Sequence, residues 1–432
     1  MTATVPHLVP ASSRSDELRA HALVLAAQIT ERLSAFPELG ETPDTVARLV
    51  DEVLEDEAQK AVTRGGGWSP EQEGRLRKLI TDHVLGLGAV EELLTEPGVE
   101  NIHITGSEPV IVDFGAGRRE ERPPVVETDD DLVALVRRAA ARALGGERRF
   151  DLSAPILSME LPGGERLSAI MPGIATRPSV TIRLHRDGFL RLGDLARAGT
   201  VDQAARDLLV AAVRARLNIL ISGATNAGKT TLLRALLGTV DAQRIITIED
   251  SLELGLHRLG TNANVMALQG RPANIEGVGE VSLAELVRAA LRMCPDRVIV
   301  GETRGPETLA LLNAMSMGTD GSMSTIHASG SRQVFTKLAA YCAQSAERLN
   351  PSATAALVAS ALHLVVHLDT APSGDRVVAS IRQVVGVEGE QVISDELYLR
   401  DADQATGEVV CPPSGEVARR LMRAGYAVRG WV

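Results

Sequence analysis

The sequence predicts an α/β protein with a helical N-terminal region, a small α/β domain and a larger C-terminal α/β domain built on a doubly wound sheet. Three observations support this fold class. Apolar residues recur at helical spacing through most of the first 80 residues. Short strand-like segments and turns begin near residue 85. From residue 217, short apolar runs alternate with helical segments, and polar residues follow the runs, which is typical of a doubly wound sheet with its site along one edge.

The N-terminal region, residues 1–80, is expected to be a helical appendage that carries no recognisable chemistry. Thr42 as N-cap and Pro43 in the first turn predict the start of one helix. Ser69 and Gln72 form a capping box for the next helix. The prediction is a loose start at 1–14, helices at 15–35, 43–62 and 70–84, and a flexible break at 63–67.

The second domain is expected at residues 81–186 and the third at 201–432, with a linker at 187–200. The second domain is predicted to contain strands at 101–104, 110–112, on both sides of the turn at 161–164, and at 180–184, with a helix at 130–144. The third is predicted to contain strands at 217–221, 244–248, 297–301 and 322–326, with helices at 202–215, 231–237, 282–293 and 306–317.

A glycine-rich loop follows the first strand of the third domain. Residues 223–230 read GATNAGKT and match the P-loop pattern G-x-x-x-x-G-K-[ST] between an apolar strand and a helix. The loop amides and the positive end of the helix dipole favour phosphate. Lys229 is expected to reach the β- and γ-phosphates, and the Thr230 hydroxyl to hold Mg²⁺. The predicted nucleotide-binding residues are Gly223, Ala224, Thr225, Asn226, Ala227, Gly228, Lys229, Thr230 and Thr231.

The lysine in this loop is informative because the chain uses arginine almost everywhere else. Of the 45 basic residues, only four are lysines, yet one of them stands where a compact ammonium fits and a planar guanidinium does not. We therefore expect the chain to bind ATP together with Mg²⁺. The alternative is a structural turn between a strand and a helix.

Acidic residues end two of the predicted strands. Glu302 is expected to polarise the attacking water, and the alternative is a carboxylate that caps the helix near Pro306. Glu249 and Asp250 converge on the same edge and need a cation such as Mg²⁺, the alternative being a pair that caps a turn. The predicted metal-binding residues are Thr230, Glu249 and Glu302.

A histidine and several arginines complete the predicted site. His327 follows the last strand and is expected to sense the γ-phosphate, whereas the alternative is a satisfied core histidine. Arg304 lies two residues after Glu302 and can neutralise charge that develops in phosphoryl transfer. Further candidates, which could reach in from another domain or subunit, are Arg166, Arg177, Arg183 and Arg271.

The composition of the chain limits the kinds of partner that we expect it to bind. A net charge of −11 and an aromatic content of 2% argue against a broad footprint for nucleic acid or anionic lipid, so no direct nucleic-acid partner is expected. The three scattered cysteines fit free thiols in a reducing compartment. No uninterrupted run of 18 apolar residues and no signal-peptide pattern occur. These features predict a cytoplasmic protein that reaches a membrane through partners.

Four segments resemble, in order, the Walker A, Asp-box, Walker B and His-box motifs of the ATPase superfamily that drives type II secretion, type IV pili and type IV secretion. They are GATNAGKTT (223–231), RIITIEDSLEL (244–254), the segment from Arg271 to Glu307, and MSMGTDGSMSTIHA (315–328). Segments 148–170 and 179–186 are similar to the N-terminal domain of that family. The resemblance is strongest to the CpaF-type subgroup of Tad/Flp pilus assembly.

The resemblance implies a PAS-like N-terminal domain, a RecA-like ATPase domain with a C-terminal extension, and a homo-hexamer. It also implies ATP bound between the two domains and closed by arginines, with domain motion pushing on an inner-membrane platform protein. Asn226 stands where the family usually has glycine, which is tolerable because asparagine accepts left-handed backbone angles, and Thr303 replaces an apolar residue. The matching residues are Lys229, Thr230, Glu249, Glu253, Glu302, His327 and Arg183.

The expected function is an ATP-hydrolysing motor that powers assembly of a Tad/Flp-type pilus or a type II/IV secretion system. Such a motor is expected to lie at the inner face of the cell membrane. A nucleotide-gated docking scaffold with little turnover is one alternative, because the usual Walker B aspartate is absent and Asp296 lies at the wrong end of its strand. A DNA-handling conjugation ATPase is the other.

Overall fold

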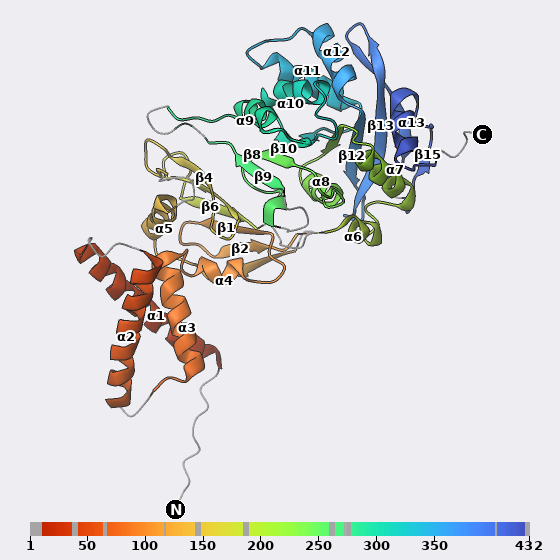
Figure 1. Ribbon diagram of the computed structural model, residues 1–432. Helices are drawn as coiled ribbons and strands as arrows, with labels where there is room; N and C mark the ends of the chain where they lie inside the picture. The colour runs from red at the N-terminus through yellow and green to blue at the C-terminus, as the bar shows by residue number, and fades with distance from the viewer. Residues whose placement is uncertain are drawn as a thin grey trace, which may run out of the picture. The chain divides into compact units, whose positions relative to one another are not determined.

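The chain divides into two compact units, residues 1–185 and 186–432 (Figure 1). Within the described residues, no helix is both long enough and apolar enough to cross a bilayer. Part of the expected loose start, residues 1–10, lies outside them, whereas residues 11–14 already belong to the first helix. The computed structural model describes residues 11–36, 42–63, 67–115, 118–142, 148–184, 190–258, 264–271, 273, 278–401 and 404–427.

Three helices form a bundle at the start of the first unit (Figure 1). They are α1 (Ala11–Ala35), α2 (Pro43–Thr63) and α3 (Pro70–Leu85). Their apolar faces meet in a core that includes Leu25 and Ile80. Both predicted caps are confirmed: the Thr42 hydroxyl accepts a hydrogen bond from the amide of Thr45 at 3.2 Å, and the capping box of α3 is complete. Residues 64–66 of the predicted break lie outside the described residues.

A six-stranded antiparallel sheet forms the rest of the first unit, in the order β3-β2-β1-β6-β5-β4. Helix α5 (Asp129–Ala141) packs its apolar side into the core of this sheet. The strands are β1 (Asn101–Thr105), β2 (Val110–Asp113), β3 (Arg119–Arg122), β4 (Ile156–Glu160), β5 (Arg166–Ile170) and β6 (Ser179–Arg183). Strand β3 and the one-turn helix α4 (Val90–Leu94) were not predicted, because β3 is wholly charged and α4 has five residues.

The second unit is built on a nine-stranded sheet with the order β15-β14-β13-β12-β7-β11-β10-β8-β9. From β12 to β9 all neighbours are parallel, and β13, β14 and β15 extend the sheet antiparallel. The strands are β7 (Ile219–Gly223), β8 (Ile245–Glu249), β9 (Val265–Gln269), β10 (Arg297–Thr303), β11 (Met323–His327), β12 (Leu364–Thr370), β13 (Arg376–Glu388), β14 (Gln391–Leu399) and β15 (Glu408–Val409).

Helices cover both faces of this sheet (Figure 1). Residues of α6, α7, α8 and α13 share one core, and residues of α9, α10, α11 and α12 share the other. Along β7, Ile219 and Ile221 face the first core and Leu220 the second. The helices are α6 (Leu192–Arg197), α7 (Gln203–Arg214), α8 (Lys229–Leu237), α9 (Leu283–Ala290), α10 (Glu307–Ser316), α11 (Gln333–Ala343), α12 (Pro351–Ala361) and α13 (Gly415–Arg423), with 3-10 turns at Leu256–Arg258 and Leu291–Met293.

The mixed α/β fold predicted from the sequence is confirmed. The structure also shows helices and strands in segments for which the sequence predicted none. Residues 187–200, expected as a linker, contain α6, whose Leu192 and Leu195 are buried in the core of the second unit. Strand β9 and all elements after β11 were not predicted. The region 353–368, expected as core, contributes most of α12 and the first part of β12.

Candidate functional site

Four parallel strands bring the predicted site residues to one edge of the nine-stranded sheet. Strands β7, β11, β10 and β8 are neighbours in that order. The register sets Gly223 beside His327 and Val300 beside Ile248. Residues at the carboxyl ends of these strands therefore converge, as the sequence predicted.

The glycine-rich loop joins β7 to α8 through two left-handed residues. Asn226 has φ 61° and Gly228, the N-cap of α8, has φ 89°. Asn226 thus adopts the kind of left-handed angle that asparagine was expected to tolerate here. Ala227 is buried in the core, while Thr230 in the first turn of α8 is half-buried. Thr231 follows in the same turn. Such a loop turns its backbone amides toward one point, which is the geometry of an anion site.

Lys229, His327 and Glu302 form a continuous chain of contacts. Lys229 is buried, with only 7% of the residue exposed. It donates to the carbonyls of Ala224 at 2.8 Å and Gly223 at 3.2 Å, and lies 3.2 Å from His327 Nδ1. On the other side of the ring, His327 Nε2 lies 2.8 Å from Glu302 Oε1.

These contacts define the tautomer of His327. Burial, and then the Lys229 ammonium, lower the pKa of His327, so the ring is neutral near pH 7. A neutral ring with its proton on Nε2 accepts from Lys229 through Nδ1 and donates to Glu302 through Nε2. The ring therefore bridges the loop lysine and the carboxylate of Glu302, and its role in sensing the γ-phosphate stays a prediction.

Glu249 is a buried carboxylate with one unused oxygen. It is 4% exposed, and its Oε2 accepts a hydrogen bond from the amide of Leu254 at 2.7 Å. Its Oε1 has no hydrogen-bond partner among the described residues. Burial raises the pKa of Glu249 to about 8, and the Glu253 carboxylate also raises it. Glu249 thus caps a turn with one oxygen, as the alternative proposed, and its other oxygen could bind a cation once the carboxyl group has lost its proton.

The residues present fit Mg²⁺ in a particular way. Among the described residues, no group of three or more His, Cys, Asp or Glu side chains could hold a metal by itself. Mg²⁺ commonly binds one or two carboxylates together with substrate phosphates. Glu249 has one oxygen without a hydrogen-bond partner among the described residues, and a site of that shared kind formed by Thr230, Glu249 and Glu302 stays a prediction.

A carboxylate that sequence reasoning missed, Glu307, performs the capping considered for Glu302. Glu307 Oε1 accepts hydrogen bonds from the amides of Arg304 at 2.6 Å and Gly305 at 2.8 Å. The available signal was an acidic residue in the first turn of α10. The guanidinium of Arg304 forms an ion pair with Asp250. Glu302 is therefore released from capping and faces His327.

Two threonines fasten β10 to β11 at the site. Thr303 Oγ1 donates to the carbonyl of Thr325 at 2.9 Å, and Thr325 Oγ1 donates to the carbonyl of Gly301 at 2.8 Å. Thr303 is buried, so a hydroxyl there is satisfied only through this bond. The bond explains a threonine at a position where an apolar residue is usual.

The other predicted arginines lie in two places. Arg166 and Arg183 face each other across β5 and β6 in the first unit. Arg177, in the same unit, binds Asp129 Oδ2 through Nε at 2.9 Å. Arg271, in the second unit, donates to a loop carbonyl at 2.8 Å. Their roles as nucleotide contacts stay predictions.

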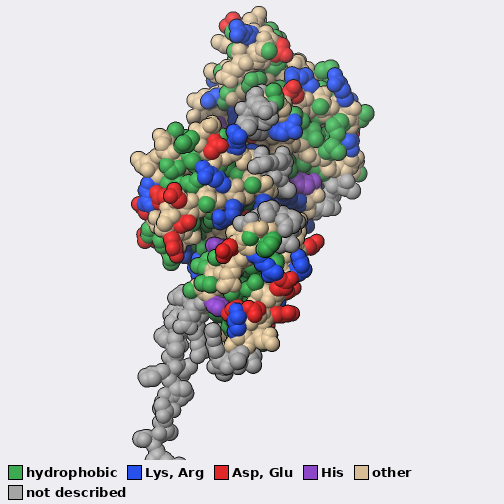
Figure 2. Space-filling model, turned by 90° about the vertical axis from the view of Figure 1, so that its left-hand side faces the viewer, with side chains coloured by type: hydrophobic (Ala, Val, Ile, Leu, Met, Phe, Trp, Pro, Cys, Tyr) green, Lys and Arg blue, Asp and Glu red, His purple; other side chains and the backbone are tan. Residues whose placement is uncertain are grey.

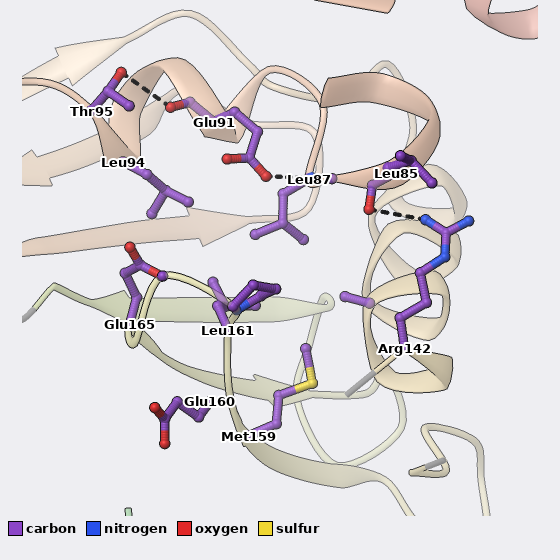
Figure 3. Close-up of a pocket in the computed structure, with 14 residues that line it drawn as sticks. Leu85, Leu87, Glu91, Leu94, Thr95, Arg142, Met159, Glu160, Leu161 and Glu165 are labelled. Carbon is purple, nitrogen blue, oxygen red and sulfur yellow. Dashed lines mark hydrogen bonds between the residues drawn. The ribbon is translucent and has the colours of Figure 1, made fainter. Parts of the chain in front are cut away.

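A separate pocket of about 200 Å³ lies in the first unit (Figure 3). Leu87 and Leu161 supply part of its apolar lining. Glu91 also lines it, its Oε1 accepts a hydrogen bond from the amide of Leu87 at 2.9 Å, and burial raises the pKa of Glu91. No predicted site residue lines this pocket.

The parallel sheet, the strand-to-helix loop and its lysine define a mixed α/β protein of the P-loop class. Within this class, the chain belongs to the family described as type II/IV secretion system protein, whose model matches residues 87–398. The family expected from the four motifs is confirmed. The CpaF-type subgroup stays a prediction.

Individual relatives point the same way. A Mycobacterium tuberculosis protein, provisionally named a conjugal transfer protein, is 37% identical over 323 residues, which are 73% of this chain and 88% of that protein. The type IV secretion system protein PtlH of Bordetella pertussis is 38% identical over 267 residues, 55% of this chain and 76% of PtlH. The crystal structure of the pilus retraction motor PilT with bound ADP has a TM-score of 0.50 at 20% identity, over 67% of this chain and 80% of that one, a likeness of fold alone.

Proposed function

We propose that the chain is an ATP-hydrolysing motor of a type II/IV secretion or pilus-assembly apparatus. The observation that carries this proposal is the chain of contacts Lys229–His327–Glu302, beside the buried and half-unpaired carboxylate of Glu249. A turn with a purely structural role does not require a buried lysine, a neutral histidine and two carboxylates at one sheet edge. The names of the relatives, which refer to type IV secretion and conjugal transfer, support a secretion-type motor.

In this mechanism each residue has a distinct task. The loop amides and Lys229 bind the phosphates, and Lys229 stabilises charge on the terminal phosphoryl group. His327 donates through Nε2 to Glu302 and holds one carboxylate oxygen in place, while the other accepts a proton from the attacking water. Thr230, Glu249 and Glu302 would hold Mg²⁺, which would neutralise phosphate charge when bound.

The finer features expected from the resemblance belong to this proposal. We propose a PAS-like first domain, a RecA-like second domain, a homo-hexamer and an inner-membrane platform protein as partner, in a Tad/Flp-type pilus system. Light scattering with and without a non-hydrolysable ATP analogue tests the hexamer. Pilin and platform genes next to this gene would support the pilus assignment.

Phosphate release by the purified protein tests the ATPase. Lys229→Ala is expected to abolish nucleotide binding. Glu302→Gln is expected to bind ATP but to turn over on the order of 10²-fold or more slowly, because it acts after binding. Equal rates in the wild type and both variants would contradict the proposal, and tight ATP binding without any phosphate release would favour a docking scaffold.

A conjugation motor is the second candidate, because relatives carry that name. The net charge of −11 counts against a direct DNA contact. On the face shown in Figure 2, basic and acidic side chains are interspersed rather than gathered by sign. A salt-dependent DNA shift in a binding assay would support a DNA-handling role, and its absence would leave protein secretion or pilus assembly.

A further inference from the structure

A hairpin from the C-terminal part of the second unit packs against the phosphate-binding loop. Strand β12 runs parallel to β7 and sets Leu368 beside Gly223. After a turn, β13 begins at Arg376, which pairs with Thr370 at the end of β12. The tip of this hairpin therefore lies at the same sheet edge as the loop.

Close contacts with two loop glycines show how near the hairpin comes. A Cβ on Gly223 would lie 2.7 Å from the carbonyl oxygen of Leu368. A Cβ on Gly228 would lie 3.3 Å from Cδ of Arg376. The stem of Arg376 thus covers the residue that precedes Lys229, and its guanidinium is bonded directly to that Cδ. This cation is therefore within reach of the loop amides, which hold phosphate in loops of this pattern.

The charge of Arg376 is not used within the hairpin. Its side chain is exposed, and none of the hydrogen bonds and ion pairs found among the described residues involves it. The two hairpin acids have other partners, since Asp375 Oδ2 accepts from the Ser373 hydroxyl and Asp369 Oδ1 from the amide of Thr370, both at 2.8 Å. A triphosphate carries more negative charge than one lysine neutralises, and a guanidinium binds phosphate with two parallel hydrogen bonds.

We propose that Arg376 binds the α- and β-phosphates of the nucleotide, as a second cation of the protein beside Lys229. The proposal rests on the proposed ATPase function and adds a residue outside the four family motifs. Because ATP and ADP both carry these phosphates, Arg376 strengthens the binding of both. It contributes to affinity more than to the chemical step, since its contact is the same before and after hydrolysis.

Competition against a fluorescent ATP analogue tests this assignment. Arg376→Ala is expected to lower the affinity for ATP, for ADP and for inorganic pyrophosphate by about tenfold each, because it removes one charged hydrogen-bonding contact. Arg376→Lys should restore part of the affinity. The control is Arg419→Ala, which removes an exposed arginine paired with Glu416 on α13.

Each outcome is informative. Unchanged affinities in Arg376→Ala would overturn the proposal, and so would weaker ATP and ADP binding with unchanged pyrophosphate binding, because the contact would then be with the ribose or base. If the wild type binds no ATP, the ATPase proposal itself fails. If the wild type binds ATP, Lys229→Ala does not, and Arg376→Ala matches the wild type, only the role of Arg376 is refuted.

Discussion

One added methyl group at Gly301 should disturb the predicted site, because it would meet the buried side chain of Glu249. A Cβ there would lie 2.9 Å from Cγ of Glu249, whereas carbon atoms pack best at about 3.5 Å or more, so a shift of about 0.6 Å is needed. Glu249 is 4% exposed and is held by the amide of Leu254 at 2.7 Å. If this carboxylate moves, it loses the hydrogen bond to Leu254 or the orientation of its other oxygen toward the predicted cation site.

We therefore expect Gly301→Ala to slow ATP turnover on the order of tenfold, since a misplacement of about 1 Å at a reacting centre can lower a rate about 10²-fold. Overpacking should also lower the free energy of unfolding by about 1–3 kcal/mol. Nucleotide affinity without Mg²⁺ should be unchanged, because the phosphate-binding loop does not contact this methyl group.

The assay is phosphate release at saturating ATP over a series of Mg²⁺ concentrations, with chemical denaturation of the same samples. Gly386→Ala is the matched control, because an added Cβ there meets no atom within 4 Å. Wild-type turnover and wild-type Mg²⁺ dependence in Gly301→Ala would refute the reasoning. An equal loss in both variants would do the same.

Two further predictions concern stability. Thr303→Val removes the hydroxyl that donates to Thr325 at 2.9 Å, so the free energy of unfolding should fall by about 1–3 kcal/mol; an unchanged denaturation midpoint would contradict this. Burial, and then the Arg420 guanidinium, lower the pKa of His363 to about 4. The unfolded histidine takes up a proton near pH 6.5 and the folded one does not, so unfolding free energy should fall by up to about 1.4 kcal/mol per unit as pH drops from about 6.5 to 4. His363→Gln should remove this part of the slope, and an identical slope in the variant would count against it.

Local spacing was enough to predict the phosphate-binding loop and the residues that end the strands. Asn226 was expected to tolerate a left-handed backbone angle where glycine is usual, and it adopts one. The capping box of α3 was predicted because its donors and acceptors lie three residues apart. Such features depend only on residues close together in the chain, so the sequence alone is enough to predict them.

Short, polar or late elements escaped prediction for physical reasons. Strand β3 carries only charged side chains and is recognised as a strand by its hydrogen bonds to β2. The first part of β12 was predicted only to be apolar core and β13 was not assigned, since no local pattern indicates which strand each of them joins. Glu307 and Glu302 are both plausible caps in sequence, and only the folded loop shows which amides each one meets.

By itself, then, the sequence predicted where the central strands lie, to within about two residues, and which loop matches a phosphate-binding pattern, since both follow from local periodicity and glycine spacing. The tertiary structure decided which of those residues touch. Lys229 and His327 are 98 residues apart and meet only because β7 and β11 are neighbours. The side chain of Glu249 leaves no room for a Cβ at Gly301, because β8 lies beside β10. The order of the strands depends on how whole faces of the sheet are buried. No short segment of the sequence carries that information.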